Sequence, residues 1–348
     1  MIVSLGQGLL RPAAVYEKPL RKIALGPDPV CSFACIAHKN SIRAMPKTMG
    51  EYAMPWNAVT QRFSRFLGDL QITADQQSDA LTKFANVGAV LQNSYYSSQP
   101  PLGSRLLVGS WGKGTQVRPS HDLDLFFILP IEEKQRFDAR TGNIQSQLLQ
   151  EVKQVLTSAY NQTDIRGDGQ VVVVQFNTIA LEVVPAFRFG DTFQIPDTHD
   201  GGRWKAADPW AEIDRIDQAD RLFGGNVRSL CKIMKHWKRE QNVPLPSFAI
   251  EQLVTDFLRN VSYGGGKSAF WFDWYSRDAL AYFCAKANSY LVLPGTNELF
   301  WLGDAWLSRA KTAYGHALKA CEWEQYDFDV TAGQEWQKIF GTRIPLRA

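Results

Sequence analysis

The most constraining feature of this chain is a flexible turn that leads into a strand carrying two carboxylates. The turn reads Gly-Ser-Trp-Gly-Lys-Gly-Thr over residues 109–115, and the predicted strand reads Asp-Leu-Asp-Leu-Phe-Phe-Ile-Leu over residues 122–129. Side chains alternate across a strand, so Asp122 and Asp124 share one face while Leu123 points into the opposite layer. One face of this strand must therefore enter a core, and the other must accommodate two adjacent negative charges.

The same stretch has the composition of a metal and phosphate site. Two neighbouring carboxylates repel each other unless a cation lies between them, and Mg²⁺ commonly bridges carboxylates to substrate phosphates. Gly109 and Ser110 supply backbone N–H groups and a hydroxyl, which can bind a phosphate. An Asp-x-Asp pair alone usually marks a solvated strand face, and a Gly-Ser pair alone is weaker still. Their combination, with eleven residues between them, favours a site for a metal and a nucleotide.

Composition narrows the class of protein. The 348 residues suffice for two domains or one large two-lobed unit. The net charge is only +3, whereas proteins that coat nucleic acid carry a strong basic excess, so nucleic acid is not indicated as a partner. Five cysteines are an odd, low number, which indicates a reducing compartment rather than a disulfide framework. With no signal peptide and no apolar run of ~18 residues, we expect a cytoplasmic protein without a membrane span.

Hydrophobic periodicity divides the chain into a mixed region and a helical region. Residues 1–54 fit neither, and we expect them to be a poorly ordered extension in which Met45 and Met54 are candidate natural starts. Helices are predicted over residues 56–70, 74–96 and 142–160, and further strands over 171–176 and 179–185. From Asp208 onward the chain reads as helical, with segments over residues 226–240, from Ser247 onward, and over roughly 268–287, 298–321 and 333–340.

Glu182 is a charge inside the apolar strand predicted over residues 179–185. Buried carboxylates are rare unless they are paired or bound to a metal. Two interpretations are open: Glu182 is a third ligand beside Asp122 and Asp124, or it lies on a solvent-facing position of a half-buried strand.

Basic residues recur on one face of the helix predicted over residues 226–240. They are Arg228, Lys232, Lys235 and Arg239. This face is either a solvated basic surface or a cationic surface for a triphosphate. The next helix begins near Ser247, and helix N-termini favour anions.

Several blocks of this sequence, in order, resemble the bacterial cGAS/DncV-like nucleotidyltransferase (CD-NTase) family, which synthesises cyclic oligonucleotide signals in anti-phage defence (CBASS). The resemblance covers roughly residues 55–325. The blocks are Gly109-Ser110 with Gly114-Thr115, Arg118-Pro119, Asp122-Leu123-Asp124, residues 164–170, residues 182–187, Asp197-Thr198, residues 201–205, Asp208-Pro209, residues 235–238, Ser247-Phe248 and Glu251.

The resemblance implies an α+β fold of the polymerase-β-like nucleotidyltransferase class. In this fold a catalytic lobe with a mixed sheet, here residues 55–207 including the N-terminal helices, is followed by a helical lobe, here residues 208–348, which closes over the nucleotide site. The extension before residue 45 lies outside the family pattern.

The resemblance also implies the site residues. Asp122, Asp124 and Glu182 match the catalytic carboxylates that bind two Mg²⁺ or Mn²⁺ ions. Many relatives carry Asp at the third position, and Glu keeps the charge with one more methylene. The implied nucleotide-binding residues are Gly109, Ser110, Thr115, Arg118, Arg203, Lys235 and Ser247.

The implied reaction is attack of a ribose hydroxyl on the α-phosphate of ATP or GTP, which releases pyrophosphate and builds a cyclic di- or trinucleotide. An alternative with the same fold is a linear oligonucleotide synthetase, or an enzyme with an RNA or small-molecule acceptor. The low net charge disfavours the RNA acceptor. A non-catalytic nucleotide-binding or scaffold protein is a third hypothesis, which the three intact carboxylates disfavour.

Two partner expectations follow from the resemblance. The cyclic product is expected to act on a separate effector protein. The C-terminus of some relatives is attached to other proteins by ubiquitin-like conjugation machinery, and Ala348 is small enough for such a transfer. The other interpretation of the tail over residues 341–348 is a frayed terminus.

Overall fold

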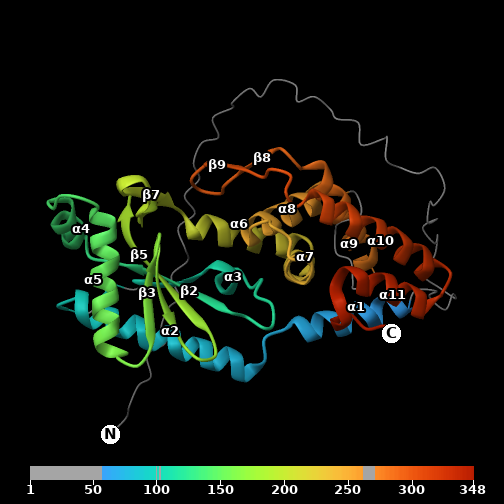
Figure 1. Cartoon of the computed structure of the whole chain (residues 1–348), viewed down its shortest axis with the longest axis horizontal. Helices are drawn as coiled ribbons and strands as arrows, with labels where there is room; N and C mark the ends of the chain where they lie inside the picture. Colours follow the sequence, from blue (N-terminus) through green and yellow to red (C-terminus); the bar gives the residue numbers. More distant parts are fainter. Residues whose placement is uncertain (1–56, 99, 102, 262–270) are drawn as a thin grey trace, which may run out of the picture. The chain divides into compact units, whose positions relative to one another are not determined.

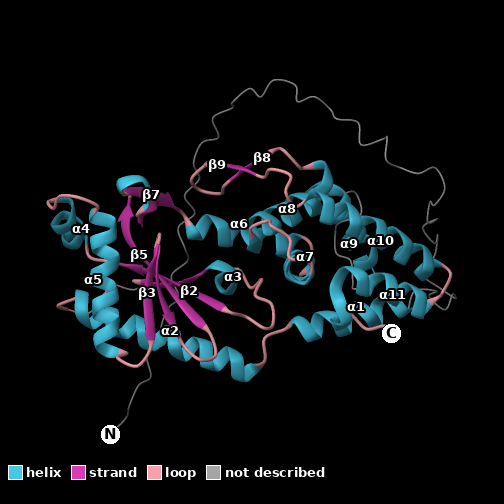
Figure 2. Ribbon diagram, in the orientation of Figure 1, coloured by secondary structure: helices cyan, strands magenta, loops and turns pink. Residues whose placement is uncertain are grey.

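The Asp-x-Asp strand is the second strand of a mixed sheet in the computed structural model, which describes residues 57–98, 100–101, 103–261 and 271–348. Seven strands of this described part form the sheet: β1 (Arg105–Val108), β2 (Asp122–Ile128), β3 (Asp164–Asp168), β4 (Val171–Gln175), β5 (Ala180–Phe189), β6 (Thr192–Asp197) and β7 (Arg203–Ala207). The order is β1-β2-β5-β4-β3, and β6 pairs with both β5 and β7. Figure 2 shows the strands in magenta. Only β2 and β5 are parallel to each other among these pairs.

The two faces of β2 follow the predicted alternation. Leu123, Leu125 and Phe127 are fully buried in a core that β2 shares with α2 (Ala74–Tyr95) and α5 (Ile144–Ala159) (Figure 1). On the opposite face Asp122 is exposed and Asp124 half-buried. Burial of the apolar face fixes the orientation of the strand. The acidic face stays accessible to a ligand.

The helices that follow the sheet share a second core. They are α6 (Pro209–Leu222), α7 (Asn226–Glu240), α8 (Ser247–Asn260), α9 (Phe272–Ala285), α10 (Leu307–Gln325) and α11 (Asp329–Phe340). Trp237, Trp306 and Trp336 are fully buried in this core. Large aromatic side chains contribute strongly to core energetics, so these three dominate the packing of the helical region.

The first helix corrects the predicted lobe assignment. We placed both N-terminal helices in the catalytic lobe with the sheet, and α2 does pack there. However, α1 (Asn57–Leu70) buries its apolar stripe in the helical core, where the Phe63 ring meets Trp336 with centroids 5.2 Å apart. The apolar stripe of α1 therefore belongs to the core of the helical region. The boundary at residue 207 stays a prediction.

A hairpin replaces the start of one predicted helix. We expected a helix over residues 298–321, but β8 (Tyr290–Val292) pairs with β9 (Leu299–Trp301), and α10 begins only at Leu307. Gly303 has a φ of +59°, which interrupts a right-handed helix at that point. The underside of the hairpin supports α8, because the Phe300 and Phe248 rings meet edge to face at 4.8 Å.

The remaining described elements are short helices. Short helices are α3 (Gly109–Gly112), α4 (Ile131–Asp138), η2 (His199–Gly201) and η4 (Gly341–Arg343). The predicted extension over residues 1–54 lies outside the described residues.

No described helix combines the length and apolar character that a bilayer crossing requires.

The tail is anchored rather than frayed, which corrects that interpretation. The fully buried guanidinium of Arg62 donates hydrogen bonds to the carbonyls of Pro345, at 3.1 Å, and Leu346, at 3.2 Å. The backbone N–H of Ala348 donates to Asp329 at 3.2 Å. A buried guanidinium without these acceptors would carry unsatisfied donors, so the tail segment is part of the packed structure.

Candidate nucleotide and metal site

Three carboxylates share one face of the sheet. Asp124 of β2 lies directly opposite Glu182 of β5 in the parallel register. Asp122 is two residues earlier on β2 and therefore shares that face. Glu182 is half-buried, so it does not lie on a freely solvated position of the strand. The register brings together the three residues that the sequence analysis had singled out as candidate metal ligands.

The carboxylates are electrostatically uncompensated. Burial raises the pKa of Asp124 to about 7, reinforced by the charges of Asp122 and Glu182 and opposed by Lys113 and Lys235. Burial also raises the pKa of Glu182, and Asp122 adds to this. A site that disfavours its own ionised carboxylates would bind a cation favourably.

Carboxylate oxygens are hard ligands, and hard ligands suit Mg²⁺ and Mn²⁺. The chemistry of the three side chains therefore fits a magnesium-type ion. Among the described residues, however, no three Asp, Glu, His or Cys side chains are grouped closely enough to ligate a metal as they stand. A metal site at Asp122, Asp124 and Glu182 therefore stays a prediction.

The Gly-Ser turn lies directly against these carboxylates. Gly109 has a φ of +59°, and a Cβ at this position would lie 1.8 Å from the Asp124 carboxylate. Any other residue would displace Asp124, so this position requires glycine. The indole N–H of Trp111 donates to the Asp122 carbonyl and to the Ser120 hydroxyl, both at 3.0 Å. These contacts fix the turn to the start of β2.

A cavity of about 610 Å³ lies between this turn and the helices α7 and α8. Four predicted nucleotide-binding residues line it together with Asp122 and Asp124, namely Gly109, Ser110, Lys235 and Ser247. The volume is within the range of small-molecule sites. The fold therefore assembles the acidic strand, the turn and the basic helix face around one space.

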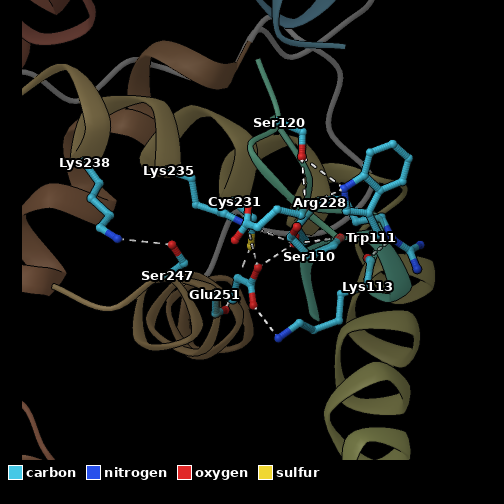
Figure 3. A network of polar contacts seen from close by, with 12 residues as sticks. Ser110, Trp111, Lys113, Ser120, Arg228, Cys231, Lys235, Lys238, Ser247 and Glu251 are labelled. Atoms are coloured by element: carbon cyan, nitrogen blue, oxygen red, sulfur yellow. Dashed lines mark hydrogen bonds and ion pairs between the residues drawn. The ribbon is translucent and has the colours of Figure 1, made fainter. Parts of the chain in front are cut away.

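A buried ionic network forms one wall of the cavity. The Glu251 carboxylate of α8 contacts the Lys113 ammonium at 2.7 Å and the Lys235 ammonium at 3.0 Å (Figure 3). The Thr115 hydroxyl donates to the same carboxylate at 2.5 Å. Burial pushes the pKa of Glu251 upward, but Lys235 and Lys113 lower it to about 2. Burial also works against the charge of Lys113, yet Glu251 and Glu212 raise its pKa overall.

Lys238 differs from these two lysines. Its ammonium donates to the Ser247 hydroxyl at 3.3 Å (Figure 3). It forms no ion pair with a carboxylate of the described residues, although its burial and the nearby Lys235 lower its pKa. Lys238 also lines the cavity. It is therefore a cation that is available to an anionic ligand.

A second cavity of about 440 Å³ lies on the other side of the carboxylates. Asp122 lines both cavities, and Glu182 lines the second one together with Arg166 of β3 and Gln175 of β4. The acidic cluster is therefore flanked by two separate spaces.

Three predicted nucleotide-binding residues line neither cavity, and their placement is corrected. Thr115 is fully buried behind the site and bonded to Glu251. The Arg118 guanidinium donates to the Asp69 carbonyl at 3.0 Å. The Arg203 guanidinium donates to Asp197 at 2.9 Å. Each side chain has a partner within the fold, although Arg118 and Arg203 stay partly exposed.

The basic stripe on α7 is also not a continuous surface for phosphate. Arg228 forms ion pairs with Asp217 and Asp220, and Lys232 donates to Gln71 at 3.1 Å. Only Lys235 and Arg239 of the stripe line the cavity. The helical spacing was correct, but Arg228 in the first turn of the stripe is paired with the α6 carboxylates.

Three functional candidates escaped the sequence analysis, namely Lys113, Lys238 and the role of Glu251. Lys113 lies inside the Gly/Ser turn, and Lys238 follows Lys235 by three residues, which is the same helix face. Glu251 is a carboxylate among the apolar residues of α8. Each signal was present, but only the fold shows that the three side chains border one cavity.

Solved structures with the same architecture show the fold class. Escherichia coli MS115-1 CdnC, solved with ATP, has a TM-score of 0.60 at 18% identity and covers 82% of this chain and 98% of its own. Vibrio cholerae DncV cyclic AMP-GMP synthase, solved with the linear intermediate pppApG, has a TM-score of 0.65 at 13% identity and covers 84% and 98%. The fold is that of a polymerase-β-like nucleotidyltransferase, as the sequence predicted.

Sequence comparison shows a similarity over part of the chain. Residues 58–220 match the profile of the Second Messenger Oligonucleotide or Dinucleotide Synthetase (SMODS) domain. A probable cyclic nucleotide synthase of Bacillus cereus (strain VD146) is 23% identical over 189 residues. That match spans 45% of this chain and only 56% of the relative. This chain is therefore similar to second-messenger oligonucleotide or dinucleotide synthetases over residues 58–220.

Proposed function

We propose that this protein is a metal-dependent nucleotidyltransferase that makes a cyclic di- or trinucleotide from ATP, GTP or both. One observation carries the proposal. The Gly109-Ser110 turn and the Asp122/Asp124 pair face basic side chains of α7 across a single cavity. Nucleotidyl transfer needs this combination, because one end of the substrate is a triphosphate and the reacting phosphate develops negative charge.

The donor nucleotide would bind in the larger of these two volumes, the cavity of about 610 Å³. The backbone N–H groups of the turn and the Ser110 hydroxyl would hold phosphate oxygens. Lys238 and Ser247 would bind the outer phosphates from the helical side, with Lys235 beside them. This places the α-phosphate near Asp122 and Asp124, where the reaction requires it.

Asp122, Asp124 and Glu182 would hold the magnesium ions. When bound, these ions supply charge stabilisation for the attacking and leaving oxygens of an in-line displacement. The chain's own contribution is to orient the donor, to hold the carboxylates on one strand face, and to bind the pyrophosphate through Ser110 and Lys238.

The acceptor nucleotide would bind in the cavity of about 440 Å³ beyond Asp122. Its ribose hydroxyl would then approach the α-phosphate from the side opposite the donor's outer phosphates. Cyclisation requires the linear intermediate to turn around between the two spaces. The relative solved with pppApG is described as a cyclic AMP-GMP synthase, which makes ATP and GTP the first candidate substrates here.

The product would act on a separate effector in bacterial antiviral defence, and the enzyme would act in the cytoplasm. Attachment of the C-terminus by ubiquitin-like conjugation machinery would require the tail to leave its contacts with Arg62 and Asp329. Expression with neighbouring genes and a search for adducts of higher mass tests this part of the proposal.

Incubation with four labelled nucleoside triphosphates and Mg²⁺ or Mn²⁺ tests the activity. We expect pyrophosphate release and a product that resists phosphatase, because a cyclic oligonucleotide has no terminal phosphate. A phosphatase-sensitive product identified by mass spectrometry would instead indicate a linear oligonucleotide synthetase. Transfer only to an added RNA or small molecule would replace the proposal with another acceptor class, and no metal-dependent pyrophosphate release would exclude catalysis.

Replacement of Lys238 by methionine is expected to raise the KM for ATP about tenfold, which corresponds to the loss of one charge-assisted hydrogen bond. The free energy of unfolding should change little, because Lys238 has no carboxylate partner among the described residues. Lys319→Met on the exposed face of α10 is the control. Steady-state kinetics and thermal unfolding measure the two effects, and an unchanged KM would remove Lys238 from the phosphate site.

A further inference from the structure

We propose that Glu251 is a positioning residue that holds Lys113 and Lys235 in the cavity wall and so prepares the site for a triphosphate. The inference rests on the proposed function, because it concerns the same cavity. Glu251 does not itself contact the substrate in this proposal. It acts through the two lysines, of which Lys113 follows α3 and Lys235 lies in α7.

The first observation is the geometry of the carboxylate. One Glu251 oxygen, Oε2, contacts the Lys113 ammonium at 2.7 Å, and the other, Oε1, contacts the Lys235 ammonium at 3.0 Å. Oε1 also accepts the Thr115 hydroxyl at 2.5 Å. Each oxygen therefore serves one lysine (Figure 3). The carboxylate of α8 joins the Gly-Ser turn to α7 across the cavity wall.

The second observation is burial. Glu251 is 3% exposed, and the side chains of Lys113 and Lys235 are 7% and 11% exposed. Two ammonium groups this close together in a dry environment repel each other and favour loss of a proton. The Glu251 charge offsets both effects. Without it, at least one lysine would become neutral or move away from the cavity.

The third observation is the number of N–H donors that each lysine ammonium keeps for a ligand. A lysine ammonium has three N–H donors. Lys113 uses them on Glu251 and on Glu212, at 3.0 Å. Lys235 uses them on Glu251 and on the Thr115 hydroxyl, at 3.5 Å. Each ammonium retains a donor for a phosphate oxygen. Both side chains line the cavity. Glu251 therefore holds the two cations in place and leaves each of them one N–H donor for a phosphate.

The test measures binding of α,β-methylene ATP, which cannot undergo transfer, by calorimetry with Mg²⁺. Glu251→Gln keeps the shape and one acceptor but removes the charge. We expect its Kd to rise about 10- to 100-fold, as for the loss of one or two charge-assisted hydrogen bonds. An unchanged or tighter Kd would overturn the inference, because Glu251 would then only compete with phosphate for the lysines.

A background without the lysines separates positioning from general packing. In the Lys113→Met/Lys235→Met variant, the further change Glu251→Gln should leave the Kd unchanged, because the partners through which Glu251 acts are absent. An equal weakening in both backgrounds would show that Glu251 acts independently of the lysines and would overturn the inference. Methionine fills a similar volume, but it leaves the buried Glu251 without a cation, which is destabilising. Thermal unfolding of this background is therefore measured before binding.

Two further variants guard against loss of fold. Glu251→Asp retains the charge but is one methylene shorter, so it cannot reach both ammonium groups, and we expect an intermediate Kd. Wild-type affinity in this variant would contradict the inference. Glu335→Gln is the matched control, since Glu335 is 8% exposed and pairs with His316 and Lys338 away from the cavity. Its Kd should not change.

Binding by the wild-type protein distinguishes failure of the proposed function from failure of the Glu251 inference. If it does not bind α,β-methylene ATP, the proposed function fails and the inference fails with it. If it binds, and Glu251→Gln binds equally well, the inference alone fails and the nucleotidyltransferase proposal stands.

Discussion

Replacement of Asp122 and Asp124 together by alanine is expected to abolish nucleotide product while leaving the protein folded. The two side chains are the acidic face of β2; both border the larger cavity, and Asp122 also borders the second one. A catalytic metal ion stabilises the transition state by several kcal/mol. Each 1.36 kcal/mol corresponds to about tenfold in rate, so a loss of at least about a thousandfold is expected. Radiolabelled product formation measures it.

Stability provides the control for this double variant. The pKa of Asp124 is raised to about 7 from its ordinary value of 3.8, first by burial and then by Asp122 and Glu182. The stability that protonated Asp124 contributes is therefore fully present below about pH 4 and is lost as the pH rises through about 7. Without divalent cations, the thermal midpoint should fall between pH 5 and pH 8 in the wild type and fall less in the double variant.

A variant at an exposed acid completes the comparison. Asp191→Ala, in the turn between β5 and β6, should keep wild-type activity and wild-type pH dependence. Undiminished synthesis by the Asp122/Asp124 double variant would remove these residues from the reaction, whatever the stability measurements show.

The acidic strand and the turn before it were predictable because their signals are local. Period-two alternation placed Leu123 and Leu125 in the core, and the structure confirms both as fully buried. The third carboxylate needed more than periodicity. Whether Glu182 faces Asp124 depends on which strand pairs with β2 and in which register, and the sequence by itself left a solvent-facing position open.

Other features depend on partners that are distant in the sequence. Arg203 and Arg228 looked like phosphate ligands, but the first pairs with Asp197 and the second with Asp217 and Asp220. The role of Glu251 depends on Lys113, which lies 138 residues earlier in the chain. A charged residue in a sequence shows that a counter-charge is needed, and only the fold shows whether a neighbour or a ligand supplies it.

The helix α1 was predicted in the catalytic lobe, but it packs in the core of the helical region. Its apolar spacing predicted a helix, and the helix is present. Periodicity gives the width of the apolar face but not the surface against which that face packs. Phe66, for example, packs edge to face against the His236 ring of α7, with centroids 5.3 Å apart. The sequence therefore predicts the helix but not which of the two cores receives its apolar face.

Glu182→Gln is expected to lower the rate of nucleotidyl transfer by about a hundred- to a thousandfold, since it removes one charged ligand where phosphate charge develops. Glutamine keeps the shape of the side chain, so the sheet should remain intact. Burial raises the pKa of Glu182, with Asp122 and Asp168 adding to it. Removal of this charge should therefore stabilise the metal-free protein at neutral pH while it increases the Mg²⁺ concentration needed for half-maximal rate.

The matched control for Glu182 is Asp168→Asn. Asp168 is an exposed carboxylate at the end of β3 that also raises the pKa of Glu182, but it lines neither cavity. Its replacement should leave the rate and the Mg²⁺ dependence near those of the wild type. If Glu182→Gln behaves in the same way as this control, Glu182 is a half-buried strand residue without a catalytic role, and the metal ions would have to be held by Asp122 and Asp124 alone.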